Sequence, residues 1–186
     1  MDKRAVRRDC FSKINSLSPA EKEAHSCAIA RHIGETKQFR GSKCVFTYCA
    51  MPSEPDLSQL FRDNENKIWG FSRIGKDARI SFHHVQSPDD LIEGSFGFLE
   101  PDPERCPLLS ASKPDLILVP GVGFDPGNLA RVGRGKGHYD RYLQSAISSE
   151  TELSIFGICF SIQCTNLIPD SHDMPMSAIY TELGRA

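Results

Sequence analysis

The sequence predicts an α/β fold in which helices cover a mostly parallel sheet. Helical patterns alternate with apolar, strand-like runs along the chain, an order that is typical of layered α/β proteins. The run at 115–121 is apolar after its first residue and ends at a Pro-Gly pair, as expected of a central parallel strand covered on both faces. With 186 residues and no internal repeat, the chain is expected to form one domain over residues 1–186.

Two helices are predicted at the start of the chain. Apolar residues recur at helical spacing over residues 3–16, which indicates an amphipathic helix. A capping-box pattern at 18–21, with proline at the first helical position, marks the start of a second helix. That helix should continue to Ile33, because Gly34 is placed to end it.

The next part of the chain mixes short strands with a turn and a helix. β-Branched and aromatic residues predict a first strand over 43–50, and the prolines of 51–56 predict a turn. Apolar residues at 57–61 suggest a helix after that turn. Further short strands are expected at 68–71 and 80–85.

The second half is expected to start with an irregular segment. Residues 86–114 contain several prolines and only brief apolar patches, so they are predicted to be mainly loop. After the central strand, a helix should begin near Lys136 and continue through Ile147. Another buried strand is predicted at 153–160, and a short last strand at 178–181.

Composition and charge argue against several classes of protein. The 22 Lys and Arg residues nearly balance the 24 Asp and Glu residues, for a formal charge of −2, so general nucleic-acid or membrane-surface binding is not indicated. No apolar run is long enough to span a bilayer and no signal-peptide segment follows the charged start, so a cytoplasmic protein is expected. The seven cysteines form no CxxC pair and are expected to be reduced, mostly as small core residues.

The segment between the central strand and the next helix carries the candidate chemistry. It is about fifteen residues long, whereas compact α/β units usually need about two to six, and it follows the carboxyl end of a strand, where open α/β sheets bind ligands. Its glycines alternate with cations, so that backbone N–H groups can approach a phosphate. We interpret it as a polyphosphate site made of Gly133, Gly135 and Gly137 with Arg131, Arg134, Lys136 and Arg141.

Asp140, within the first turn of the predicted helix, is placed to hold a Mg²⁺ that is bound mainly by phosphate oxygens and water. Two other interpretations stay open, because glycine-rich patterns are weak evidence and this one is neither of the standard nucleotide-binding motifs. In the first of these interpretations the segment is a solvated basic loop, and in the second it is a tract that binds RNA backbones.

A second group of cations lies at the N-terminus, where Lys3, Arg4, Arg7 and Arg8 fall in the first two turns of the predicted helix. The helix dipole disfavours positive charge there by roughly a few tenths of a kcal/mol per residue. Lys3 and Arg7 are four residues apart and share a face. Either this face closes over the same polyphosphate, or the segment is a disordered, solubilising start.

The run 115–125, followed by the run 131–141, resembles the signature of the 5-formyltetrahydrofolate cyclo-ligase (methenyltetrahydrofolate synthetase) family. That signature is a DLI-x-x-PG-x-x-FD strand and turn followed by an RLGRGKGYYD loop. The resemblance extends over essentially the whole chain. Its other elements are the K-x-x-L-R-like start at 3–7, the strand and turn at 48–54, the EP element at 98–101, and the HD and TE pairs at 172–173 and 181–182.

The resemblance implies an ATP- and Mg²⁺-dependent ligase with a three-layer, Rossmann-like mixed sheet, mostly parallel and flanked by helices, a fold shared with sugar-phosphate isomerases and coenzyme A transferases. Such enzymes convert 5-formyltetrahydrofolate to 5,10-methenyltetrahydrofolate with release of ADP and phosphate. The formyl oxygen attacks the γ-phosphate of ATP, and N10 of the folate then closes on the activated carbon. We expect a monomer with this folate as its small-molecule partner, and no nucleic-acid or membrane partner.

The resemblance also implies roles for individual residues. The expected catalytic residues are Lys136, Tyr139 and Arg134, and the expected metal ligand is Asp140. ATP is expected to contact Lys3, Arg4, Arg7, Arg131, Gly133, Arg134, Gly135, Lys136, Gly137, His138 and Tyr139. The folate is expected to contact Met51, Glu54, Arg134, Gly135, Lys136, Gly137, His138 and Tyr139.

Among the departures from the family pattern, two concern the site. His138 replaces the first tyrosine of YYD. Aligning the tail motifs places Ser177 where the family often has a second Mg²⁺-binding aspartate, and a hydroxyl is a poorer Mg²⁺ ligand, so weaker Mg²⁺ dependence is expected. Two other functions fit the same residues: a related kinase-like or phosphate-ester enzyme, and a non-catalytic nucleotide or RNA binder that keeps the basic loop.

Overall fold

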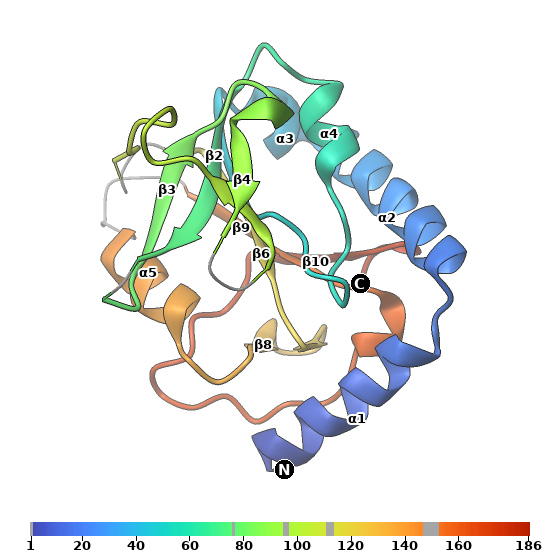
Figure 1. Cartoon of the computed structure of the whole chain (residues 1–186). Coiled ribbons are helices and arrows are strands. Elements are labelled where there is room, and N and C mark those ends of the chain that lie inside the picture. Colours follow the sequence, from blue (N-terminus) through green and yellow to red (C-terminus); the bar gives the residue numbers. More distant parts are fainter. Residues whose placement is uncertain (1, 76, 95–96, 111–113, 147–152) are drawn as a thin grey trace.

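Parallel strands dominate the main sheet of the computed structural model (Figure 1), which describes residues 2–75, 77–94, 97–110, 114–146 and 153–186. The strand order is β11-β10-β9-β6-β1-β2-β3; the strands from β10 to β2 are parallel, and the edge strands β3 and β11 are antiparallel to their neighbours. The order reverses between β1 and β6, where sheets of this kind leave a crevice for ligands. The bounds are β1 Cys44–Thr47, β2 Ile68–Ile74, β3 Ile80–His84, β6 Leu116–Pro120, β9 Ser154–Ile158, β10 Ala178–Thr181 and β11 Gly184–Arg185.

Helices cover both faces of this sheet (Figure 1). In the central strand β6, Leu116 and Leu118 pack in one core with α2, α3 and α4, whereas Ile117 and Val119 pack in a second core with α5. All four side chains are fully buried. The predicted three-layer fold and the predicted burial of this strand on both faces are therefore confirmed. The bounds are α2 Pro19–Gly34, α3 Lys37–Gly41, α4 Ser58–Arg62 and α5 His138–Ala146.

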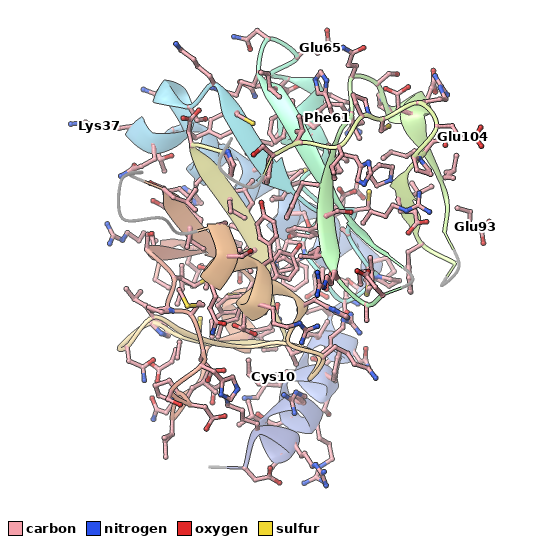
Figure 2. The ribbon with its side chains drawn as sticks, turned by 90° about the vertical axis from the view of Figure 1, so that its left-hand side faces the viewer. Cys10, Lys37, Phe61, Glu65, Glu93 and Glu104 are labelled. Atoms are coloured by element: carbon pink, nitrogen blue, oxygen red, sulfur yellow. The ribbon has the colours of Figure 1, made fainter. Side chains whose placement is uncertain are left out.

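The first helix, α1 (Lys3–Ser16), packs on a two-stranded hairpin at the lower edge of the sheet in Figure 1. Val6 and Cys10 of the helix share a small core with Val132 of the hairpin, and Figure 2 labels Cys10 on this helix. The hairpin, β7 (Gly123–Asp125) and β8 (Ala130–Val132), lies in the segment predicted to be loop. That prediction was wrong, because strands of three residues are too short to give a period in the sequence.

Several other boundaries differ from the prediction. The first strand ends at Thr47 rather than 50, and α5 begins at His138 rather than Lys136. Gly34 is the last residue of α2 and the chain continues through Glu35 with a right-handed φ, so the helix does not use the left-handed freedom of glycine. The expected extension of α5 to Ile147 lies outside the described residues. Elements that the sequence did not predict are α3, β11, the 3-10 turns Pro88–Asp90 and Ser161–Gln163, and the hairpin β4 (Leu91–Glu93) and β5 (Leu99–Pro101).

The starts of α1 and α2 follow from their first residues. Asp2 caps α1 by accepting a hydrogen bond from the Arg4 amide at 2.9 Å. At α2 the predicted capping box is present, because Ser18 accepts from the Glu21 amide and Glu21 accepts from the Ser18 amide. Within the described ranges, no helix has the length and apolar character needed to cross a membrane.

Gly157 of β9 makes room for the hairpin, and we expect its replacement to be costly. A Cβ at this position would lie 2.5 Å from the buried ring of Phe124 in β7. Gly157→Ala should therefore lower the free energy of unfolding by about 1–3 kcal/mol, as overpacked cores do. Gly41→Ala is the control, because a Cβ at Gly41 meets nothing within 4 Å. Urea unfolding of both variants checks this, and equal stability of the two would contradict it.

Candidate active site

A cleft of about 1270 Å³ lies at the carboxyl ends of β1, β2 and β6. It is at the point where the strand order reverses, as expected for an open α/β sheet. Its walls include the turn after β1, the end of β2, the region from Phe98 to Pro103, the glycine-rich segment 133–137, the first turns of α1 and α5, and residues 170–173. Segments that are far apart in sequence thus meet in one site.

The glycine-rich segment forms one wall of the cleft in an open conformation. Gly135 and Gly137 have φ values of 95° and 64°, a left-handed region that favours glycine. The segment is held by two arginines: Arg7 Nε donates to the Gly133 carbonyl at 2.7 Å, and Arg141 Nη1 donates to the Lys136 carbonyl at 2.8 Å. The exposed Lys136 ammonium forms no hydrogen bond or ion pair with any described residue, so its charge is left for a ligand.

Helix α1 brings two of its four N-terminal cations into the cleft. Lys3 and Arg7 line it, as their shared face predicts. Lys3 Nζ donates to Asp170 Oδ2 at 2.7 Å and to Asp173 Oδ2 at 2.5 Å, which ties the helix to the segment before β10. Arg4 is exposed and does not line the cleft, so the structure does not bring it together with the other expected ATP ligands. The neighbouring Arg8 is also exposed.

Arg131 and Asp140 form a buried ion pair at the base of the site. Arg131 Nη2 lies 2.8 Å from Asp140 Oδ1, and only 4% of the arginine side chain is exposed. Arg131 Nε is buried and has no hydrogen-bond partner among the residues that the structure describes. Both residues line the cleft. The positive charge of Arg131, which the sequence analysis expects to contact a phosphate, is therefore already compensated by Asp140. One carboxylate oxygen of Asp140 is in turn engaged with Arg131.

Glu54 lies in the turn after β1, where Met51 also reaches the cleft. Its carboxylate accepts a hydrogen bond from the Met51 amide at 3.1 Å and lies 3.6 Å from Arg134 Nε. Burial raises the pKa of Glu54 above its usual value, although the Met51 amide and the Arg134 guanidinium favour the charged form. Arg134 also donates to Ser53 Oγ at 2.7 Å and lies over the ring of Phe11.

Tyr139 and His138 occupy the first turn of α5. The Tyr139 hydroxyl donates to Ser72 Oγ at 3.4 Å, and burial raises the pKa of Tyr139 well above its usual value. The phenol is therefore neutral, a donor rather than a base. His138, which replaces the first tyrosine of the family motif YYD, lines the cleft, and its Nδ1 lies 2.7 Å from the carbonyl of Ala78.

Ser177 is not a site residue, which corrects the tail alignment. It is exposed and precedes the first residue of β10, at the end of the sheet opposite the cleft, where its Oγ accepts from the Ile155 amide at 3.0 Å. The cleft contains Asp170, His172 and Asp173 instead. One ligand atom from each lies within 4.8 Å of the others. The HD pair was recognised in the sequence, and its Asp173 lines the cleft, whereas Ser177, four residues further along, does not.

The sequence did not assign a role to the pair Arg73 and Glu100, which line the cleft beside Phe98. Arg73 Nη2 lies 2.9 Å from Glu100 Oε1, and Arg73 Nη1 donates to the Pro101 carbonyl at 2.7 Å. The EP element indicated where the glutamate belongs in the chain. Its partner could not be found because Arg73 lies in β2 and Glu100 in the unpredicted β5.

Comparison with known proteins identifies the family. Residues 1–182 match the 5-formyltetrahydrofolate cyclo-ligase family. The chain is 35% identical to 5-formyltetrahydrofolate cyclo-ligase of Mycoplasma pneumoniae, with 98% of this chain and 99% of that protein covered. It is 27% identical to the enzyme of that name from Mus musculus, with 97% and 93% covered. The NMR structure of Aquifex aeolicus 5,10-methenyltetrahydrofolate synthetase superposes with a TM-score of 0.84 at 30% identity, covering 100% of this chain and 92% of that one. The chain thus belongs to the 5-formyltetrahydrofolate cyclo-ligase family.

Proposed function

We propose that this cleft converts 5-formyltetrahydrofolate to 5,10-methenyltetrahydrofolate with consumption of ATP. The observation that supports this most directly is that one cleft joins a cationic glycine-rich wall to a wall of apolar side chains with two carboxylates. The first wall suits a triphosphate and the second a flat, partly polar ring system. A non-catalytic nucleotide or RNA binder, the alternative from the sequence, gives no reason for the second wall.

The cationic wall is proposed to hold the phosphates of ATP. Phosphoryl transfer depends mainly on positioning and on neutralising charge that spreads over the phosphate oxygens. Lys136 supplies a free point charge, Arg7 holds the segment through Gly133, and the N-terminus of α5 adds unpaired N–H groups. These groups would orient the γ-phosphate toward the formyl oxygen. In this transfer the formyl oxygen forms a bond to the γ-phosphorus while the bond between that phosphorus and ADP breaks. The product is a formyl group phosphorylated on its oxygen, whose carbon is activated for attack.

The second wall is proposed to hold the folate through ring closure. Glu54 is held by the Met51 amide beside Arg134, in a place where its carboxylate would face N10. As N10 attacks the activated carbon, phosphate leaves and N10 loses a proton. The buried Glu54, with a raised pKa, is suited to accept it. Tyr139 would donate a hydrogen bond to the ring or to the formyl group.

The donors in the cleft fit Mg²⁺, which prefers oxygen ligands and keeps several waters. Asp173 and Asp170 already accept a cation, because the Lys3 ammonium bridges them. Asp173 and Asp140 both line the cleft, and we propose that they hold the metal. When bound, the metal would neutralise charge on the phosphates.

The corrected metal assignment makes a direct prediction. Asp173→Asn should raise the Mg²⁺ concentration for half-maximal activity about tenfold or more, because one carboxylate is lost. Ser177→Asp, made as its matched control, should leave the Mg²⁺ curve unchanged, because position 177 lies at the other end of the sheet. Activity titrations with Mg²⁺ check both. A changed curve for Ser177→Asp, with an unchanged curve for Asp173→Asn, would favour position 177 over Asp173 as the metal position.

The proposed reaction is tested by the absorbance of the methenyl product. Purified protein with 5-formyltetrahydrofolate should form it with ATP and Mg²⁺ and not without ATP. Binding of ATP with no product at high enzyme concentration would favour the non-catalytic binder. Three expectations stay predictions: a cytoplasmic location, a monomeric state, and the absence of nucleic-acid or membrane partners. Sedimentation analysis of the purified protein tests the monomeric state.

A further inference from the structure

We infer that Glu100 is a specificity residue that binds the 2-amino and N3–H edge of the pterin ring. This inference rests on the proposed function, because it takes 5-formyltetrahydrofolate as the ligand of the cleft. It concerns how the enzyme recognises the pterin ring, which is distinct from the reaction at the formyl group and N10.

The geometry leaves one oxygen of Glu100 available. Its Oε1 lies 2.9 Å from Arg73 Nη2, while Oε2 forms no hydrogen bond or ion pair with the part of the chain that the structure describes. The side chain is 18% exposed, on the wall of the cleft. A half-buried carboxylate with a free oxygen calls for a donor. Arg73 compensates the charge of Glu100 through Oε1, and Oε2 can accept hydrogen bonds.

The backbone is built around this carboxylate. The side chain of Glu100 passes so close to Gly94 that a Cβ there would lie 2.5 Å from Glu100 Cδ and 2.8 Å from Oε2. On the other side, Arg73 binds both Oε1 and the carbonyl of Pro101, the next residue. Two contacts from different elements therefore fix the orientation of one side chain, as binding residues require.

The surroundings of Glu100 suit a flat, apolar ring. Phe98 and Pro103 of the hairpin region line the cleft together with Cys49 after β1. Burial, with the charges of Asp56 and Glu100 adding to it, raises the pKa of the Cys49 thiol to about 12, which places Glu100 near the turn after β1. The two carboxylates Glu54 and Glu100 thus border one chamber. Because Glu54 is assigned to N10, Glu100 is left for the far edge of the ring.

The chemistry of the ligand matches. The pterin of 5-formyltetrahydrofolate carries two adjacent donors, the 2-amino group and N3–H, which a carboxylate can accept side by side. Charge-assisted hydrogen bonds of this kind are roughly twice as strong as neutral ones. A site built to bond a substrate N–H also rejects analogues that lack it, because its own polar group is left unpaired.

The competing explanation is that Arg73 and Glu100 only fix the hairpin to β2. The two explanations differ in which variant changes ligand discrimination. Binding is measured by calorimetry without ATP, for 5-formyltetrahydrofolate and for its 2-desamino-2-methyl analogue. The proteins are the wild type, Glu100→Ala, Glu100→Gln, Arg73→Ala and the control Glu93→Gln. Glu93 is an exposed carboxylate on β4 of the same hairpin and does not line the cleft (Figure 2).

The wild type and Glu93→Gln should bind the natural folate about 10- to 100-fold more tightly than the analogue. Glu100→Ala should bind both alike, and Glu100→Gln, which keeps one acceptor, should fall between. Arg73→Ala should weaken the binding of both ligands and should reduce the preference less than Glu100→Ala does, because the carboxylate that recognises the ring is still present. Equal losses of preference in Arg73→Ala and Glu100→Ala, or a preference that survives in Glu100→Ala and Glu100→Gln, would overturn the inference. Failure of the wild type to bind the folate at all would instead reject the proposed function.

Discussion

Lys136→Ala is expected to lower kcat/KM for ATP about 100- to 1000-fold, the size of effect seen when one group that stabilises transition-state charge is removed. The reason is that this ammonium forms no hydrogen bond or ion pair with a described residue, while Arg7 and Arg141 bind the backbone around it. Stability should change little, because no hydrogen bond or ion pair to a described residue is lost. The rate of methenyl product formation and the thermal midpoint measure the two parts of this prediction.

Lys37→Ala is the matched control for Lys136. Lys37 is an exposed lysine at the first position of α3, outside the cleft lining (Figure 2). Its replacement removes the same charge from the protein and should leave the rate within about twofold. If both variants retained wild-type activity, the proposed role of the Lys136 charge would be wrong. If both lost activity equally, the effect would come from net charge rather than from the site.

The layers of the fold could be predicted because burial leaves a strong pattern in the sequence. A strand covered on both faces must be apolar throughout, and β6 is. The capping box of α2 satisfies local donors and needs nothing from the rest of the chain. The β7–β8 hairpin was missed because its three-residue strands are stabilised by contacts from α1 that no local pattern records.

The site shows the same division between local and long-range information. Lys3 and Arg7 could be paired because helical spacing puts them on one face. Which of the four cations face the cleft depends on the docking of α1 on the hairpin, which brings Lys3 and Arg7 to the cleft lining and not Arg4. Ser177 was expected in the site because an alignment of two short motifs does not show at which end of a strand a residue lies. In the structure Ser177 precedes β10, at the amino ends of the parallel strands and away from the cleft.

Asp140→Ala is expected to destabilise the protein by about 3–5 kcal/mol, because it leaves the cation of Arg131 buried without its partner. Urea unfolding measures this loss in the absence of nucleotide and metal. A change in activity alone would not separate it from the proposed metal role, since both are lost together. A second variant is therefore required that removes the charges of both Arg131 and Asp140.

The double variant Arg131→Met with Asp140→Leu should recover most of that stability, since an apolar pair of suitable volume replaces a buried ion pair at little cost. It should not recover activity, because neither a carboxylate for the metal nor a guanidinium beside Tyr139 remains. Stability and activity would then separate, as expected if the pair holds the first turn of α5 in place through charge compensation and Asp140 keeps its second oxygen for the proposed metal. If the single variant were as stable as the wild type, Arg131 would not depend on Asp140. If the double variant were active, Asp140 would not be a metal ligand.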